Sequence, residues 1–308
     1  MRINTNTAAM NTYSQLTSAN ASKSSSLAKL SSGLRINKAG DDAAGLAISE
    51  KMKNQISGMN QASRNAQDGI SLIQTAEGGL TETHSILNRM RDLAIQAKND
   101  TNTAEDRGAI QKEMDSLTKE VDRIANQTEF NGKKLLNGDF ADGTKDLTFQ
   151  IGANKGQDIK LNVANMTAAG LGIGTVDADE KITGGLDVSS EAKAAIAEDA
   201  TDPDNIIPAQ DATEGADFDD VIGKLDAAIK SVSDERANLG ATQNRLDHTV
   251  SNLATTKENL SEANSRITDV DMAEEMMSFT KSNILSQAST AMLAQANQMP
   301  QGVLQLLQ

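Results

Sequence analysis

Apolar residues recur at every seventh position along one long stretch in the C-terminal third of the chain. The repeat runs unbroken through Leu225, Val232, Leu239, Leu246, Leu253, Leu260 and Ile267. A seven-residue repeat keeps one narrow stripe on one side of a helix and is typical of a left-handed coiled coil. The positions four residues further on are half polar, since they include Arg236, Gln243 and Lys257. The pattern therefore predicts a helix over residues 225–267, about 65 Å long, that packs through one strong seam.

Two more long helices are predicted before it. Residues 43–97 carry apolar positions at near-heptad spacing, and residues 104–127 alternate steps of four and three. Thr103 and Asp106 form a capping pattern at the start of the second. Because the connection between the two helices is short, we expect them to be antiparallel neighbours.

Four glycines lie inside the predicted helix over residues 43–97. Gly58, Gly69, Gly78 and Gly79 each cost about 0.5–1 kcal/mol relative to alanine in a helix interior. Tertiary packing must therefore hold this helix. The glycines mark either close approach of a neighbouring backbone or weak points, and we favour close approach.

The two ends of the chain have thinner apolar stripes. In residues 5–34 the seam consists of Tyr13, Leu16, Leu27, Leu30 and Leu34, and in residues 272–308 of Leu285, Met292, Met299 and Leu306. Asn20, Lys23 and Asn283 interrupt these stripes, so an isolated pair of terminal helices would be marginal in water. Segments that cannot offset their ordering entropy alone can do so when many copies pack together. We infer that the chain polymerises through its ends.

The middle of the chain has a different character. Residues 147–151 and 159–163 alternate apolar and polar positions around a glycine-containing turn, which predicts a β-hairpin. Residues 177–220 contain 14 Asp and Glu against two Lys and account for most of the net charge of −14. This stretch has little periodicity, so we expect a small, exposed acidic insertion.

Composition excludes several classes of protein. The strong negative charge argues against a nucleic-acid binder, which needs a basic surface. The chain has no cysteine, no long apolar run that would span a membrane and no apolar region typical of a secretory signal. His84 and His248 both fall on helical seams, where we expect half-buried packing roles. We predict no catalytic, cofactor-binding or metal-binding residues and no cofactor.

Six segments have a residue order specific enough to indicate a family. They are SSGLRINKAGDDAAGLAIS (31–49), DGISLIQTAE (68–77), TEFNG (128–132), FQIG (149–152), LGATQNRL (239–246) and ILSQASTAMLAQAN (284–297). In this order they resemble bacterial flagellin, and the resemblance spans roughly residues 1–175 and 220–308.

The resemblance implies a structural subunit of the bacterial flagellar filament, which serves swimming motility and is not an enzyme. Residues 1–44 and 268–308 would form an inner tube of coiled-coil terminal helices. Residues 45–175 and 221–267, with the hairpin, would form an outer tube. Residues 176–220 would be the short, solvent-exposed acidic insertion. The expected fold is mainly α, a long antiparallel coiled-coil helical rod with a small β-hairpin region, and Gly33–Gly45 matches the family's connector between layers.

The resemblance also implies partners and a location. Copies of the same chain would form the filament outside the cell, after export in the unfolded state by the flagellar type III apparatus with its chaperone. Filament cap and hook-junction proteins would bind the polymer. Neither nucleic acid nor membrane is expected as a partner. The vertebrate Toll-like receptor for flagellin would bind a surface that includes Arg89, Leu93 and Glu113.

A second hypothesis belongs to another class. Similar helices could serve a secreted, monomeric coiled-coil effector or tip protein that binds a host receptor. Polymerisation of the purified chain separates the two hypotheses. An enzyme ranks third, because the sequence shows no combination of acid, base and nucleophile.

Overall fold

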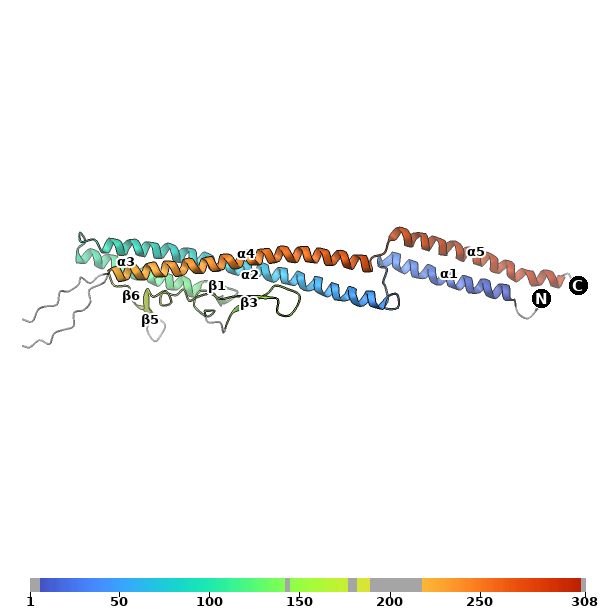
Figure 1. The fold of residues 1–308 in the computed structure, drawn as a ribbon, viewed down its shortest axis with the longest axis horizontal. Helices are drawn as coiled ribbons and strands as arrows, with labels where there is room; N and C mark the ends of the chain where they lie inside the picture. The colour runs from blue at the N-terminus through green and yellow to red at the C-terminus, as the bar shows by residue number, and fades with distance from the viewer. Residues whose placement is uncertain (1–5, 142–144, 177–181, 189–217, 306–308) are drawn as a thin grey trace, which may run out of the picture. The chain divides into compact units, whose positions relative to one another are not determined.

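Helices make up most of the chain in the computed structural model, which describes residues 6–141, 145–176, 182–188 and 218–305 (Figure 1). The helices are α1 (Thr7–Ser32), α2 (Ala43–Ala97), α3 (Ala104–Gln127), α4 (Phe218–Thr268) and α5 (Met272–Gln305). All five predicted helices are present, although α4 begins earlier than the heptad pattern does. The predicted capping pattern is also present, since Thr103 and Asp106 form a reciprocal capping box at the start of α3. The prediction of a mainly α fold is confirmed.

The strands form three small antiparallel pairs. The predicted hairpin is confirmed as β3 (Leu147–Gln150) and β4 (Asp158–Leu161), with Phe149 opposite Ile159. The other pairs are β1 (Glu129–Phe130) with β2 (Lys133–Lys134), and β5 (Gly174–Val176) with β6 (Ile182–Gly185). The sequence pattern did not predict either of these pairs, because β1 and β2 have only two residues each and β5 and β6 (GTV and ITGG) do not alternate apolar and polar residues.

The chain divides into two units. The terminal unit comprises residues 1–59 and 254–308, and the central unit comprises residues 60–253. Both boundaries fall inside long helices, so they differ from the boundaries at 44/45 and 267/268 that the resemblance suggests. That division concerns the assembled state and stays a prediction.

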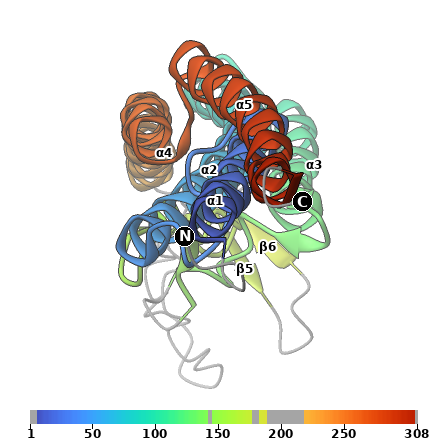
Figure 2. The ribbon, with the colours of Figure 1, turned by 90° about the vertical axis from the view of Figure 1, so that its right-hand side faces the viewer.

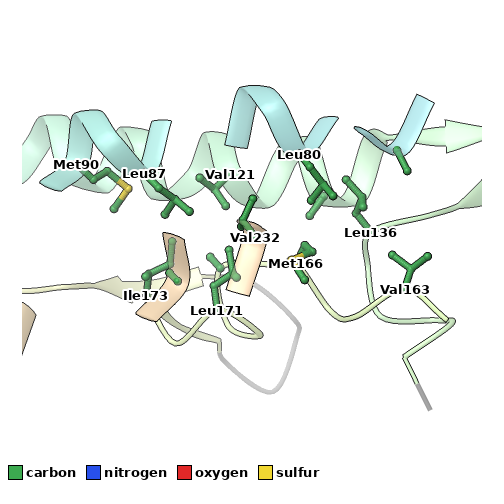
Figure 3. Close-up of a cluster of buried hydrophobic side chains, with 14 of the residues drawn as sticks. Leu80, Leu87, Met90, Val121, Leu136, Val163, Met166, Leu171, Ile173 and Val232 are labelled. Atoms are coloured by element: carbon green, nitrogen blue, oxygen red, sulfur yellow. The ribbon is translucent and has the colours of Figure 1, made fainter. Parts of the chain in front are cut away.

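The central unit contains a continuous apolar core. On α4, Leu225, Val232, Leu239 and Leu246 are completely buried, whereas Leu253 is half-buried. Side chains from three helices and from the segment after β2 meet in this core (Figure 3). The labelled ones are Leu80, Leu87 and Met90 of α2, Val121 of α3, Val232 of α4, and Leu136, Val163, Met166, Leu171 and Ile173. The heptad positions thus form the α4 side of the core.

A second row of buried residues on α4 lies beside the heptad positions. It lies three residues after them, whereas we expected it four residues after. Ala228, Glu235 and Thr242 are buried, whereas Arg236 and Gln243 are half-buried. The heptad alternates steps of three and four, so either spacing fits the repeat. A pattern built from apolar residues could not predict the burial of Glu235, because glutamate is a polar residue.

Two of the interior glycines mark close approach of neighbouring side chains, whereas we favoured close approach of a neighbouring backbone. A Cβ atom on Gly79 would lie 2.9 Å from Oγ1 of Thr128 and 3.0 Å from Leu136. A Cβ atom on Gly69 would lie 3.1 Å from the ring of Phe149 in β3. Gly78, by contrast, has open space around it. The missing side chains at 69 and 79 let the β3–β4 hairpin and the turn after α3 lie against α2.

The expected exposed insertion over residues 176–220 is corrected at its start. Leu186 and Val188 are buried in the central core. The side chain of Gln111 in α3 holds them, because its Nε2 donates to the Leu186 carbonyl (3.1 Å) and its Oε1 accepts from the Val188 amide (2.7 Å). Residues 189–217 lie outside the described residues, as do 177–181. The acidic residues dominated the composition there and concealed two core positions.

The two histidines differ from each other. His84 is half-buried, as expected, and its Nδ1 is buried without a hydrogen-bond partner among the described residues. His248 is exposed, so the prediction of a half-buried packing role was wrong for this residue. It follows the buried Leu246 by two positions on α4, which places it about 200° around the helix.

Candidate assembly surface

Helices α1 and α5 pair along their length within the terminal unit, as Figure 1 shows from the side and Figure 2 from the end. They run antiparallel, since contacts join Asn6 to Ala296 near one end and Lys29 to Glu275 near the other. On α5 the residues facing inward step by four and three. They are Glu275, Phe279, Ser282, Ser286, Ser289, Leu293 and Ala296, all buried or half-buried. Small and polar side chains therefore dominate this interface.

The polar residues that interrupt the predicted seams bind each other. Nζ of Lys23 donates to Oδ1 of Asn283 at 2.9 Å, and Oγ of Ser286 donates to Oδ1 of Asn20 at 2.8 Å. Nδ2 of Asn6 donates to the carbonyl oxygen of Ala296 at 2.8 Å. Hydrogen bonds between defined partners fix the register of two helices that lack interlocking apolar side chains.

The predicted apolar seams do not form the interface between α1 and α5. Leu16 and Leu30 are half-buried, as is Leu34 just after α1. Tyr13, Leu27, Leu285 and Met292 are instead exposed, with exposed fractions of 63%, 55%, 48% and 60%. Each of these four lies one position from an inward-facing residue, and one position turns a side chain by about 100° around a helix. The side chain of Met299 and residue Leu306 lie outside what the structure describes.

Large exposed apolar side chains concentrate in the terminal unit. Ten of the eleven among the described residues lie there, the exception being Ile95 of α2. The ten are Met10, Tyr13, Leu27, Ile48, Met272, Met276, Met277, Ile284, Leu285 and Met292. The buried apolar residues of this unit, again among those described, are Ala19, Ile36, Met59 and Ala296. The unit exposes more apolar side chain than it buries, which is typical of a surface that binds another protein.

The segment between α1 and α2 is tightly organised. Gly33 ends α1 with a φ of 72°, a conformation that favours glycine. The Arg35 amide then donates to the Thr268 carbonyl (2.6 Å), and the Val270 amide donates to the Gly33 carbonyl (3.1 Å). This short antiparallel bridge joins the chain after α1 to the chain between α4 and α5. The α1–α2 connection and the α4–α5 connection are thereby hydrogen-bonded to each other.

Two aspartates complete this connector. The amides of Asn37 and Lys38 donate to Oδ2 of Asp41, and these hydrogen bonds hold the pKa of its carboxyl below its ordinary value. Asp42 caps α2, with Oδ1 accepting from the Gly45 amide at 2.8 Å. A Cβ atom on Gly45 would lie 2.4 Å from the Asp42 carboxylate, so the cap requires glycine at this position.

The remaining seven-step residues of α4 belong to the terminal unit. Leu260 and Ile267 are half-buried. A buried polar contact lies near them, where Oγ of Ser49 donates to Oδ1 of Asn264 at 2.8 Å. The apolar seam of α4 is therefore completely buried only from Leu225 to Leu246.

The residues of the expected receptor surface are partly exposed. Arg89 of α2 and Glu113 of α3 form an ion pair at 2.8 Å, and about half of each side chain is exposed. Leu93 is only 2% exposed in the subunit and belongs to the central core, and its part in a receptor surface stays a prediction. Leu93 lies on the side of α2 that faces the core, and in the subunit it packs into that core, whereas Arg89 and Glu113 stay partly exposed to solvent.

No cluster of three or more histidine, aspartate or glutamate side chains has the geometry to hold a metal ion within the described ranges. None of the described helices combines the length and the hydropathy needed to cross a lipid bilayer.

Comparisons with known proteins identify the family. Residues 3–141 match the model of the bacterial flagellin N-terminal helical region, and residues 222–307 match that of the C-terminal helical region. The chain is 55% identical over 316 residues to a flagellin of Bacillus subtilis and 50% identical over 307 residues to one of Halalkalibacterium halodurans, covering 100% of both chains in each pair.

A solved structure shares the fold. It is a putative flagellar hook-associated protein from Vibrio parahaemolyticus, with a TM-score of 0.52 and 17% identity, covering 74% of this chain and 100% of that one. The family models and the two flagellins extend along nearly the whole sequence and agree with each other. This chain therefore belongs to the bacterial flagellins, the structural and non-enzymatic subunits of the extracellular flagellar filament.

Proposed function

We propose that this flagellin self-assembles through α1 and α5, whose exposed apolar side chains become buried between copies. The observation that carries the proposal is the inverted packing of the terminal unit, with small and polar residues inside and large apolar ones outside. Burying an exposed leucine, isoleucine or methionine side chain stabilises an assembly by about 1.5–3 kcal/mol. Several such side chains per subunit supply a driving force that a single copy lacks.

The proposal assigns residues 1–44 and 268–308 to an inner tube and residues 45–175 and 221–267 to an outer tube. The seam residues Tyr13, Leu27, Leu285 and Met292 then contact neighbouring subunits, whereas Leu16 and Leu30 are already half-buried within the subunit. Met299 and Leu306 are assigned to the same seam only by their seven-residue spacing from Met292 in the sequence. The connector over residues 33–45 lies between the two layers.

Export in the unfolded state through the flagellar type III apparatus fits the same packing. The terminal unit buries few apolar residues, so it opens at a low free-energy cost. Before assembly, the exposed methionines of α5 present a surface to an export chaperone, since methionine adapts to varied partners. We propose that filament cap and hook-junction proteins bind the same terminal helices. In support of this, the present chain shares its fold with the putative flagellar hook-associated protein.

A pair of serine substitutions tests the assembly proposal. Ile284→Ser with Leu285→Ser removes two exposed apolar side chains of α5, and Ser278→Ala with Gln287→Ser changes exposed polar ones on the same helix. Purified protein is mixed with filament seeds, sedimented and viewed by negative-stain microscopy. We expect the first variant to stay soluble and the control to polymerise.

Deletion of residues 1–30 or 280–308 provides a second arm. Each deletion should abolish polymerisation and leave the central unit folded, as followed by circular dichroism. If both the apolar variant and the deletions polymerise like the intact chain, assembly does not proceed through these helices. An intact chain that stays monomeric in the presence of seeds would favour the monomeric effector.

A further inference from the structure

Methionines in this chain fall into two populations. In the central unit Met90, Met114 and Met166 are at most 2% exposed. In the terminal helices five are among the most exposed apolar residues, with exposed fractions of 64%, 50%, 49%, 67% and 60%: Met10, Met272, Met276, Met277 and Met292. Every methionine classed as exposed among the described residues therefore lies on α1 or α5.

The composition makes these sulfur atoms the preferred site of oxidation. The chain contains no cysteine and no tryptophan, and it has one tyrosine and two histidines against twelve methionines. A two-electron oxidant such as hydrogen peroxide therefore reacts chiefly with thioethers, and exposure decides which ones react first. The filament lies outside the cell, where the cytoplasmic reducing systems do not act on it.

We propose that the exposed methionines of α1 and α5 are oxidation sites that control whether a subunit can assemble, with peroxides as the reactant class. This inference rests on the proposed assembly through the terminal helices. The sulfur lone pair attacks one peroxide oxygen, the O–O bond breaks and an S–O bond forms. Methionine loses two electrons and becomes the sulfoxide, and with hydrogen peroxide the leaving hydroxide takes the proton from the new sulfur-bound oxygen and becomes water.

The sulfoxide changes the assembly surface and leaves the central unit intact. It converts a flexible apolar side chain into a polar one with a strong hydrogen-bond acceptor. Burying that acceptor between subunits without a donor is unfavourable, so each buried sulfoxide raises the critical concentration on the order of tenfold. Met90 and Met114 are sealed in the central core, which keeps its packing.

Assembly in turn protects the sites. If α1 and α5 are covered in the filament, their sulfur atoms lose contact with solvent oxidant. The unassembled subunit is then the sensitive form and the polymer the resistant one. Oxidation acts as a check on subunits before they join the filament.

The test treats purified monomer and preformed filament with hydrogen peroxide and maps sulfoxides by mass spectrometry. We expect the five exposed methionines to react in the monomer and to react at least tenfold more slowly in the filament. The critical concentration of the oxidised monomer, measured by sedimentation, should rise at least tenfold. Treatment with two methionine sulfoxide reductases, one for each sulfoxide epimer, should restore assembly.

Variants sharpen the assignment. A chain with leucine at positions 10, 272, 276, 277 and 292 should polymerise and lose most of its sensitivity to peroxide. Met114→Leu, a change in the buried core, should remain as sensitive as the wild type. If the leucine variant does not polymerise, the reductase arm still decides the question on the wild-type chain.

The outcomes separate this inference from the assembly proposal. Oxidised monomer that polymerises like untreated monomer overturns the inference, as does assembly that reductases fail to restore. Both results leave assembly of the untreated chain through its ends intact. The assembly proposal fails instead if untreated subunits polymerise without α1 or α5.

Discussion

Lys23 of α1 donates a hydrogen bond from Nζ to Oδ1 of Asn283 on α5, at 2.9 Å and with both side chains half-buried. In the sequence these two residues interrupt apolar stripes. In the structure they pair with each other, so the interruptions on one helix match those on the other. Because the surrounding contacts are between small residues, this bond contributes to the register of the pair.

Replacing Lys23 and Asn283 by alanine, singly and together, should give non-additive effects. The hydrogen bond stabilises the α1–α5 pair by about 0.5–1.5 kcal/mol, and either single substitution removes it completely. The second substitution then adds little to the first. Native-state hydrogen exchange of the α1 amides measures the opening free energy. Strictly additive effects would mean that the two side chains do not interact.

Two adjacent glycines of α2 should respond oppositely to alanine. Gly78→Ala should stabilise the central unit by about 0.5–1 kcal/mol, because the position is open and alanine favours the helix. Gly79→Ala should destabilise it by about 1–3 kcal/mol, because the new Cβ atom overlaps Thr128 and Leu136. Thermal unfolding followed by circular dichroism checks both. Equal shifts of the two variants would contradict the close approach at Gly79.

Glu235 should make the central unit less stable as the pH rises. Burial raises the pKa of its carboxyl above the ordinary value, against the opposing effect of hydrogen bonds from the Ala164 amide and the Asn238 side chain. The folded state therefore binds the proton more tightly than the unfolded state. Stability is highest below the ordinary pKa and falls as the pH rises through the raised pKa.

Glu235→Gln removes this dependence. The variant should be more stable than the wild type at neutral pH, and the difference should shrink as the pH approaches the ordinary glutamate pKa near 4.5. Thermal unfolding between pH 4 and pH 8 measures it. Glu258→Gln changes an exposed residue of the same helix and serves as the control. A difference that grows on acidification would reverse the sign argued here.

The ion pair of Arg89 with Glu113 should decide binding to the Toll-like receptor for flagellin, if this chain binds it. Arg89→Ala should lower the response of a receptor reporter assay by about tenfold, since exposed arginines often dominate interfaces. Arg123→Ala removes a comparably exposed arginine that pairs with Glu120 on α3 and should leave the response unchanged. A silent wild-type monomer would contradict receptor binding altogether.

The sequence predicted the long helices because their apolar residues are periodic, whether or not those residues are buried in the subunit. In α4, Leu225 to Leu246 obey the heptad and occupy the core, so pattern and burial agree. In α5, Leu285 and Met292 obey the same period and face solvent, while Ser282 and Ser286 face α1. Periodicity alone specifies a stripe and cannot say what covers it.

Other features had no periodic signal at all. Leu186 and Val188 are held by one glutamine, Gln111, which precedes them by 75 residues or more. The burial of Leu93 depends on which side of α2 meets the core, which the family's motif does not specify. Contacts between distant segments are fixed by tertiary packing, and a single sequence does not encode them locally.

Hydrogen exchange of the monomer and the filament tests the central claim most directly. The account predicts that amides of α1 and α5 exchange readily in the monomer and on the order of a hundredfold more slowly in the filament, while amides of the central unit change little. Protection of α1 and α5 in the monomer equal to that in the filament would contradict it, because the terminal helices would then need no neighbouring subunit to be stable.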